Sequence, residues 1–379
     1  MTKGDGARLQ FVSGEAPRSG WLGHVPGPLV SGFARLRRVG GMAPVLVVVI
    51  IAGSLLSPSF LTVSNFSIVL KFTSVIGLIS VGQTLVILSG RGGIDLSVGA
   101  VCALSGVSAA LLQHYGIFAI VLMAIASGGF IGLINGFGVT NGRLQPFIVT
   151  LATMTIASGL AFYLSNAAPM WLDVKGFAAI QTGTIAWVPI PLVLFLVAVA
   201  LGTIFLRYTV QGRELYAIGG NDEASRLSGI PADRLRLLVY LLSGVLAGVA
   251  SVVLMSFTQT ADPNAAQGYE LASIAAVVVG GTPLSGGQGS VLNSLVGVLI
   301  IAFVNNILIL LNVSPWMQQM FTGFIVLIAV SLEARRATSA SVTLRTRLQE
   351  LLPLTITLLI GAAIVIWILK PLSLSGGAN

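Results

Sequence analysis

The stretch ELASIAAVVVGGTPLSGGQG, residues 270–289, decides how often this chain crosses a membrane. Its apolar part is about ten residues long, which as a helix rising about 1.5 Å per residue reaches only about 15 Å. That is too short to cross a hydrocarbon core of about 30 Å alone. The glycine pair Gly280 and Gly281 then predicts a helix break, after which the chain continues as irregular backbone.

The sequence around this stretch is that of a membrane protein. Of its 379 residues, 55% are hydrophobic and only 8% are charged, and the mean hydropathy is +0.96. These values lie outside the range of a soluble domain, whose surface must be wet. Several apolar runs reach the roughly 20 residues that a spanning helix needs. We therefore expect an all-α polytopic membrane helical bundle with about 10–11 transmembrane segments, one of them broken or re-entrant.

The net charge of +8 is distributed in a way that predicts the orientation of the chain. Residues 1–42, 207–236 and 333–347 hold fifteen of the twenty lysines and arginines. The positive-inside rule places these three blocks in the cytoplasm. The basic residues do not form a patch beside aromatic side chains on which bases could stack, so nucleic acid is not an expected partner. The N-terminal tail is too long for the charged region of an ordinary cleaved signal, so we expect it to stay cytoplasmic before a retained span.

Counting crossings from the cytoplasmic N-terminus shows why residues 270–289 matter. Six crossings return the chain to the cytoplasm at residue 207, but Arg335 and Arg336 would lie outside unless one more passage occurs between residues 260 and 290. We therefore expect a half-helix followed by shielded irregular backbone. The alternative is a periplasmic amphipathic segment and a wrong count elsewhere. The other crossings are expected near 43–61, 67–89, 96–113, 117–139, 147–166, 188–206, 237–260, 290–312, 316–332 and 351–369.

A second stretch resembles the first. GGIDLSVG, residues 92–99, and GGTPLSGG, residues 280–287, share the pattern GGxxLSxG. The number of crossings that precede each stretch places both on the cytoplasmic side. If they arose by internal duplication, they would be parallel repeats around a pore axis. Chance is the alternative, because glycine, leucine and serine are common in this chain.

Charged residues beside the first copy predict its position in the membrane. An aspartate at the bilayer centre costs about 2.5–3.5 kcal/mol, so Asp95 should lie near an interface, in a watery cavity, or beside a partner. Arg91 is the nearest candidate partner. Alternatively, Asp95 caps a helix that begins at Leu96, and the two roles are compatible. We take Arg91, Gly92, Gly93, Asp95, Gly280 and Gly281 as candidate residues of the helix breaks beside a translocation path.

The remaining polar residues within the spans are mainly amides. Hydrogen bonds between helices are their ordinary role. On a path they would suit a neutral hydroxylated solute, because an amide both donates and accepts. The candidates for lining such a path are Gln83, Asn305 and Asn306. No chain of carboxylates runs through the spans, which argues against a proton-driven carrier. No GxSxG motif is present, which argues against an intramembrane hydrolase.

The basic segment 207–236 predicts a short capped helix. Asn221 is a good N-cap, Asp222 suits the first turn, and Gly229 is placed to stop the helix. Ala224 and Leu227 give it a small apolar edge, which is typical of a knob that docks in a groove of another protein. A plain solvated loop is the alternative.

Taken in order, these motifs resemble a known family. GGIDLSVGAV, GRELYAIGGNDEASRLSGI, GGTPLSGGQGSV and NNILILLNVSPWMQQMFTGFIVLIAVSLE look like segments of the permease subunits of ribose/xylose/galactose-type ABC importers, over roughly residues 43–336. The resemblance implies a second permease copy, in a homodimer or with a close paralogue. It also implies a cytoplasmic ABC ATPase and a periplasmic or lipid-anchored sugar-binding protein. The implied ATPase-coupling helix comprises Asn221, Asp222, Glu223, Ala224, Ser225, Arg226, Leu227, Ser228 and Gly229.

The resemblance also implies how the work is divided between subunits. ATP and Mg are bound by the partner ATPase, and this chain carries no cofactor, metal or catalytic site. The sequence agrees, because it contains no GxxxxGK[ST] phosphate loop. The chain is then a membrane transport subunit rather than an enzyme. The cargo is left open. A monosaccharide such as ribose or xylose is expected, and the alternative cargoes are branched-chain amino acids and nucleosides. The alternative mechanism is an ion-driven secondary carrier.

Three regions follow from this interpretation. Residues 1–42 are expected to form a cytoplasmic N-terminal tail, and residues 43–336 the permease domain with its coupling loop at 207–236. Residues 337–379 depart from the family pattern, because ELLPLTITLLIGAAIVIWILKPL is long enough to cross again. We expect a cytoplasmic linker and an extra C-terminal transmembrane helix there. The expected location is the inner (plasma) membrane, with multiple passes and a cytoplasmic N-terminus.

Overall fold

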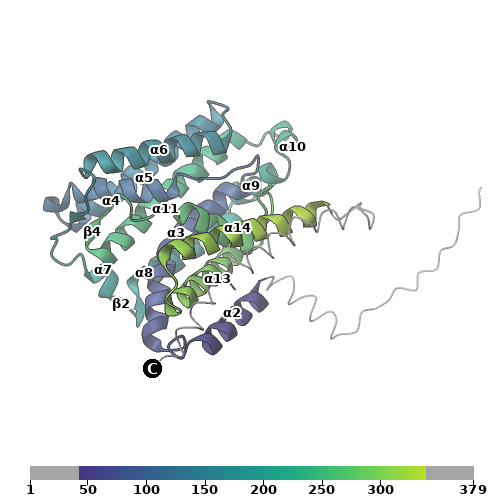
Figure 1. The fold of residues 1–379 in the computed structure, drawn as a ribbon. Helices are drawn as coiled ribbons and strands as arrows, with labels where there is room; N and C mark the ends of the chain where they lie inside the picture. Colours follow the sequence, from purple (N-terminus) through teal and green to yellow (C-terminus); the bar gives the residue numbers. More distant parts are fainter. Residues whose placement is uncertain (1–41, 339–379) are drawn as a thin grey trace, which may run out of the picture. The chain divides into compact units, whose positions relative to one another are not determined.

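The computed structural model describes residues 42–338. The predicted tail before residue 42 and the predicted extra helix after residue 338 lie outside the described residues. Within them the chain forms a helical bundle (Figure 1), which confirms the all-α class. The long elements are α2 (Ala43–Leu56), α3 (Val63–Leu88), α4 (Val98–Ala110), α5 (Ile117–Thr140), α6 (Pro146–Leu164), α8 (Ile190–Tyr208), α9 (Val210–Gly220), α11 (Ala232–Thr258), α12 (Tyr269–Val279), α13 (Val291–Leu310) and α14 (Pro315–Thr338).

Short elements connect the long ones. They are the 3-10 turn η1 (Gln113–Tyr115), the helices α7 (Ala179–Thr182) and α10 (Asp222–Leu227), and the strands β1 (Met170–Trp171), β2 (Thr184–Ile185), β3 (Val188–Pro189) and β4 (Thr260–Ala261). β1 pairs antiparallel with β4, and β2 with β3. Figure 1 shows α9 and α10 at one end of the bundle and α7, β2 and β4 at the other. We call these the α10 end and the β4 end.

The predicted crossings between residues 43 and 332 all correspond to apolar helices. Six helices in the described part are long and apolar enough to span a membrane, namely α3, α5, α6, α8, α11 and α13. The four shorter apolar helices are α2, α4, α12 and the apolar part of α14. The chain is therefore a multi-pass membrane protein.

Two crossings are shorter than the sequence predicted. α2 has 14 residues and α4 has 13, in place of the expected 43–61 and 96–113. α2 ends because Pro58 forces the preceding Ser57 into an extended conformation, with φ −145° and ψ 123°. α4 begins only at Val98, since Leu96 and Ser97 form a turn. At about 1.5 Å per residue, α4 covers about 20 Å.

The broken helix predicted at residues 270–289 is present. α12 has 11 residues and ends at Gly280, after which Gly281 adopts φ +91°. No helix or strand forms from there until α13 begins at Val291. Residues 272–278 of α12 are buried, so this segment is not a surface amphipathic helix. A half-helix followed by irregular backbone is the arrangement that membrane proteins tolerate when protein surrounds it.

Small residues let the two central helices α5 and α11 cross closely. A Cβ atom on Gly128 would lie 2.3 Å from the Gly244 carbonyl oxygen, and one on Gly132 would lie 2.4 Å from the Tyr240 carbonyl oxygen. On α11, a Cβ on Gly248 would lie 2.2 Å from the Ala124 carbonyl oxygen. Glycines spaced four apart place such contacts on one helix face. This crossing fixes the part of α11 that reaches the candidate site.

Connections that the number of crossings assigns to the same side of the membrane lie together in the structure. Residues 170–171 and 260–261, both predicted outside, pair as β1 and β4. At the opposite end, Gly287 N–H donates to the Leu88 carbonyl at 3.1 Å, which joins two connections predicted inside. The relative sides of these connections are therefore consistent with the predicted topology.

Candidate functional site

Asp95 is buried near the end of the connection between α3 and α4, with 1% of its surface exposed. Its Oδ1 accepts hydrogen bonds from the Ser97 backbone N–H at 3.0 Å and from the Ser97 hydroxyl at 2.6 Å. Its Oδ2 accepts from the Ser243 hydroxyl of α11 at 2.9 Å. A buried carboxylate that accepts several hydrogen bonds is compensated without a cation. Asp95 therefore organises the turn before α4 rather than capping a helix that begins at Leu96.

Two buried amides complete this network. Asn135 of α5 donates to the Ser97 hydroxyl at 2.8 Å and accepts from the Thr153 hydroxyl of α6 at 2.6 Å. The amide of Gln83, on α3, pairs with the backbone of Asp95: in the orientation that satisfies both groups, its nitrogen donates to the carbonyl at 3.1 Å and its oxygen accepts from the N–H at 3.2 Å. Helices α3, α5, α6 and α11 thus hold one loop, which we call the Asp95 loop (residues 89–97).

The predicted pairing of Arg91 with Asp95 is wrong. Arg91 Nη1 lies 3.6 Å from Asp222 Oδ2, and the Arg91 side chain is 59% exposed. Gly90, Arg91 and Gly92 all adopt positive φ, which directs the chain away from the helix axis at this point. The arginine therefore faces the α10 end of the bundle while the aspartate four residues later faces its interior.

The loops that carry the two GGxxLSxG motifs lie side by side, and the second motif contacts the backbone of residues 88–90, directly before the first motif. A Cβ on Gly286 would lie 2.5 Å from Gly90 Cα. The end of α9 joins them, since a Cβ on Gly219 would lie 2.0 Å from the Leu88 carbonyl oxygen and 2.4 Å from Gly287 N. We call this contact the glycine junction (Leu88, Gly90, Gly219, Gly286 and Gly287). Glycine is required there because any side chain would separate the three segments.

The helices around the two motifs are not equivalent. The first motif follows the 26-residue α3 and precedes the 13-residue α4. The second follows the 11-residue α12 and precedes the 20-residue α13. The order of long and short helices is therefore opposite around the two copies, although their loops meet.

The basic segment 207–236 is mostly helical and contains the predicted capped helix. The Asn221 side chain accepts a hydrogen bond from the Ala224 N–H at 3.0 Å and caps α10. α10 ends before Ser228, and Gly229 takes φ +82°. Leu227 is 85% exposed and has no apolar cover within the described residues. The helix α9 and its packing against the Asp95 loop were not predicted.

A cluster of ion pairs ties α10 to α11 and to the Asp95 loop. Arg236 of α11 donates from Nη2 to Asp222 Oδ1 at 2.6 Å and to the Ser89 carbonyl at 3.2 Å. Arg226 donates from Nε to Asp222 Oδ2 at 3.1 Å and from Nη1 to Asp233 Oδ2 at 2.9 Å. Partial burial alone raises the pKa of Asp222, but the hydrogen bonds and charges of Arg236 and Arg226 outweigh it and hold that pKa below its ordinary value.

The sequence did not single out Arg236, Asp233 or Ser243. Arg236 counted only as part of a basic block, although it lies inside the apolar helix α11 and three residues after an acidic residue. An arginine within the first turns of an apolar helix is the signal that would have found it, because such a residue needs a partner. Ser243 gave no signal, since its role depends on the crossing of α5 and α11.

The three amides proposed for the path occupy different environments. Gln83 is fully buried against Asp95. Asn306 of α13 exchanges two hydrogen bonds with Asn65 of α3, at 2.8 and 2.9 Å. Asn305 is half-buried, and its side chain makes no hydrogen bond within the described residues. The structure therefore brings Arg91, Gly92, Gly93, Asp95 and Gln83 together at one end, apart from the Asn65–Asn306 pair near the start of α3. Gly280 and Gly281 do not contact this group directly, and their loop meets it through Gly286 and Gly287.

Comparison with known proteins identifies relatives over most of the chain. Residues 65–330 match the family described as the branched-chain amino acid transport system / permease component. The ribose import permease protein of Bacillus subtilis is 41% identical over 306 residues, which cover 80% of this chain and 94% of the relative. That of Haemophilus influenzae is 39% identical over 291 residues, covering 75% of this chain and 90% of the relative. The L-arabinose ABC transporter permease protein of Azospirillum brasilense is 34% identical over 307 residues, covering 80% and 90%. No solved structure matches the chain.

Proposed function

The chain belongs to the branched-chain amino acid transport system / permease family, and from this premise we propose that it is the permease subunit of an ATP-driven importer of a monosaccharide. The names of its relatives support a sugar as cargo, because they are a ribose import permease and an L-arabinose permease. A pentose is the first substrate to test. The family description favours one other cargo, a branched-chain amino acid, which the same experiment tests.

One observation supports coupling between an ATPase and this permease: the exposed helix α10 is hydrogen-bonded to α11 and, through it, to the Asp95 loop. α10 presents Leu227, which is 85% exposed, on the surface. Asp222 on the same helix reaches Arg236, and Arg236 reaches the Ser89 carbonyl of the Asp95 loop. A short helix that is unstable alone in water gains its order from such contacts. A force applied to α10 therefore reaches the Asp95 loop through two hydrogen bonds.

A second route connects α9 with the end of α3 and with the second motif. Gly219, at the end of α9, touches the Leu88 carbonyl and Gly287. The Tyr216 hydroxyl of the same helix donates to the Gly289 carbonyl at 2.8 Å. Because Gly219 meets Leu88 and Gly287 backbone to backbone, α9 and the two glycine loops cannot move independently without opening the glycine junction. A partner that moves α9 and α10 together would displace both glycine loops at once.

We infer the following mechanism from these contacts. A cytoplasmic ATPase with two nucleotide-binding domains binds ATP and Mg and docks on α10 through Leu227 and Ala224. Closure of the ATPase moves α10, and the glycine loops follow. The permease then changes between two discrete arrangements, open to one side or the other. The chain itself supplies no ATPase site and acts as the transport component.

The rest of the proposed assembly follows from orientation. The basic residues of the α9–α11 region support a cytoplasmic location for the α10 end, and we propose that the N-terminus lies on the same side of the inner membrane. A periplasmic or lipid-anchored sugar-binding protein then delivers solute at the β4 end. A second permease copy completes the path. Asn305, half-buried and without a hydrogen-bond partner within the described residues, is the amide that we assign to the path.

Uptake into vesicles tests the function. The chain is reconstituted with its ATPase and binding protein, and uptake of ribose, xylose, L-arabinose, galactose and leucine is measured with and without ATP. ATP-dependent uptake of one sugar and not of leucine supports the proposal. Uptake of leucine alone would replace the sugar by an amino acid, and uptake driven by an ion gradient without the ATPase would refute the importer mechanism.

A matched pair of variants tests α10 as the docking element. Leu227→Ser removes the exposed apolar side chain and should abolish both ATPase co-purification and uptake, because an isolated apolar knob carries much of the docking energy. Val210→Ser changes an apolar residue of α9 that is 57% exposed at the same end, and both properties should survive. Equal loss in the two variants, or loss in neither, would contradict a specific role of α10.

A further inference from the structure

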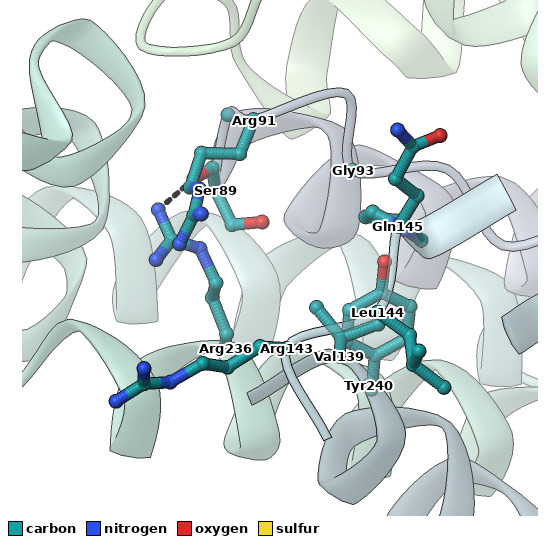
Figure 2. A pocket seen from close by; sticks show the side chains of 11 residues that line it. Ser89, Arg91, Gly93, Val139, Arg143, Leu144, Gln145, Arg236 and Tyr240 are labelled. Carbon is teal, nitrogen blue, oxygen red and sulfur yellow. Dashed lines mark hydrogen bonds between the residues drawn. The ribbon is translucent and has the colours of Figure 1, made fainter. Parts of the chain in front are cut away.

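A cavity of about 100 Å³ lies at the α10 end, separate from the exposed surface of α10. Figure 2 shows its lining. Three segments contribute: the Asp95 loop, the connection between α5 and α6, and the first turns of α11. The polar residues among them are Ser89, Arg91, Arg143, Gln145, Arg236 and Tyr240.

Buried donors at this cavity lack partners. Arg236 is 2% exposed, and although its Nη2 is satisfied, its Nε and Nη1 make no hydrogen bond within the described residues. Nη1 lies 4.0 Å from Asp233 Oδ1, too far for a hydrogen bond. The hydroxyl of Tyr240, one turn further along α11, is also buried without a partner. Unsatisfied buried donors are destabilising, so an acceptor at this place would stabilise the protein.

The charge around the cavity is positive. Arg91, Arg143 and Arg236 line it. Asp222 is shared by Arg91, Arg226 and Arg236, and Asp233 also pairs with Arg226. Arg143 makes no ion pair within the part of the chain that the structure describes. The four arginines face two aspartates, which leaves an excess of two positive charges.

The backbone around the cavity also favours an anion. α6 begins at Pro146 beside the cavity, and the side chain of its N-cap residue Gln145 makes no capping hydrogen bond. The N-terminus of this 19-residue helix carries the positive end of the helix dipole. Arg91 and Arg143 adopt φ +53° and +52°, a conformation that is unfavourable for arginine.

We propose that this cavity binds a phosphate group. Its oxygens would accept from Arg236 Nε and Nη1 and from the Tyr240 hydroxyl, and Arg143 would supply a further guanidinium. Arginine suits phosphate because its planar fork presents several donors at fixed geometry. The excess positive charge accommodates a phosphate group as a singly charged diester or as a doubly charged monoester.

The surroundings favour a lipid as the source of the phosphate. Leu144, Phe147 and Ile148 follow Arg143 along the chain, and each is 52–53% exposed. An apolar surface beside a basic pocket at a membrane interface is the arrangement that accommodates an anionic lipid, with the acyl chains on the apolar side. A soluble phosphate ester shares the same headgroup chemistry, so the test has an arm for each source.

The test uses the full-length chain purified in detergent. Thermal unfolding is followed while inorganic phosphate is added at constant ionic strength against chloride. In the second arm, phosphatidylglycerol is added against diacylglycerol with the same acyl chains. We expect phosphatidylglycerol to raise the unfolding temperature and diacylglycerol not to. Stabilisation by inorganic phosphate as well would show that the phosphate group alone suffices.

Variants separate this site from general charge effects. Arg143→Gln and Tyr240→Phe remove groups that have no partner in the protein, so the fold should survive. Each should weaken the apparent affinity for the stabilising probe about tenfold, the effect of one lost hydrogen bond to a charged group. Arg234→Gln, which changes an exposed arginine of α11, is the control and should keep the affinity. Equal affinity of the wild type and both variants, stabilisation by neither probe, or an equal loss in the control would overturn the proposal.

Discussion

Arg236 donates a hydrogen bond from Nη2 to Asp222 Oδ1 at 2.6 Å, although 14 residues separate them in the sequence. The arginine is 2% exposed and the aspartate side chain 21%. This contact joins the buried start of α11 to the exposed helix α10. It converts a six-residue helix on the surface into a part of the bundle.

Replacing Asp222 by asparagine should destabilise the chain and uncouple transport. The variant keeps the shape but leaves the buried Arg236 without its charged acceptor, which costs about 1–3 kcal/mol. We expect lower thermal stability and a strong loss of ATP-driven uptake. Glu223→Gln is the control for stability alone, because Glu223 is exposed and makes no ion pair within the described residues, although it lies on the same docking helix. A variant with unchanged uptake would show that this ion pair does not transmit the motion.

The stabilisation from Asp222 should depend on pH in a defined direction. The pKa of Asp222 is held below its ordinary value of 3.8, so the folded state favours the charged form. The stability that this carboxylate contributes is therefore complete well above pH 3.8 and is lost as the pH falls through the lower folded pKa. Thermal unfolding of the wild type and Asp222→Asn from pH 7 downward measures this. Their difference should stay constant to about pH 5 and then shrink; a difference that grows at acid pH would contradict the assignment.

The glycine junction provides a pair of neighbouring substitutions with opposite expectations. In Gly219→Ala the new Cβ would lie 2.0 Å from the Leu88 carbonyl oxygen, so the segments must separate. We expect ATP-driven uptake to fall by at least an order of magnitude at equal protein levels. In Gly220→Ala the Cβ meets nothing within 4 Å, and uptake should stay near that of the wild type. If the two variants behave alike, close contact at the junction does not matter for transport.

Two substitutions at Asp95 separate its hydrogen bonds from its charge. Asp95→Asn removes the charge and turns one acceptor into a donor, while Asp95→Ala leaves the Ser97 and Ser243 donors without their acceptor. At about 1–3 kcal/mol for each buried donor left unpaired, alanine should destabilise the chain more than asparagine does. Uptake at equal protein levels should fall in the same order. Wild-type uptake by Asp95→Ala would refute a role of the Asp95 loop in transport.

The neighbouring amides Asn305 and Asn306 should behave differently. Asn306→Ala breaks the reciprocal pair with Asn65, and a double-mutant cycle should give a coupling of about 0.6–1.7 kcal/mol in stability. Asn305→Ala breaks no hydrogen bond within the described residues, so stability should hold while sugar uptake decreases. Wild-type uptake by Asn305→Ala would remove this residue from the path.

Patterns that depend on neighbours in the chain were readable from the sequence. Apolar runs predicted nine crossings between residues 43 and 332, because a bilayer of fixed thickness dictates helix length. The half-helix before Gly280 followed from the same argument together with the positions of the arginines. The cap at Asn221 and the stop at Gly229 were also predicted, since both act within one helical turn.

Which polar groups meet across the bundle was decided only by the tertiary structure. Arg91 and Asp95 are four residues apart, and proximity in the sequence wrongly predicted an ion pair. Positive φ at Gly90, Arg91 and Gly92 turns the backbone here, so the arginine reaches Asp222 instead. The partners of Asp95 come from α5 and α11 because glycines let those helices cross closely. Local sequence determines where helices start and stop, whereas the pairing of buried charges depends on how helices pack, which no short stretch encodes.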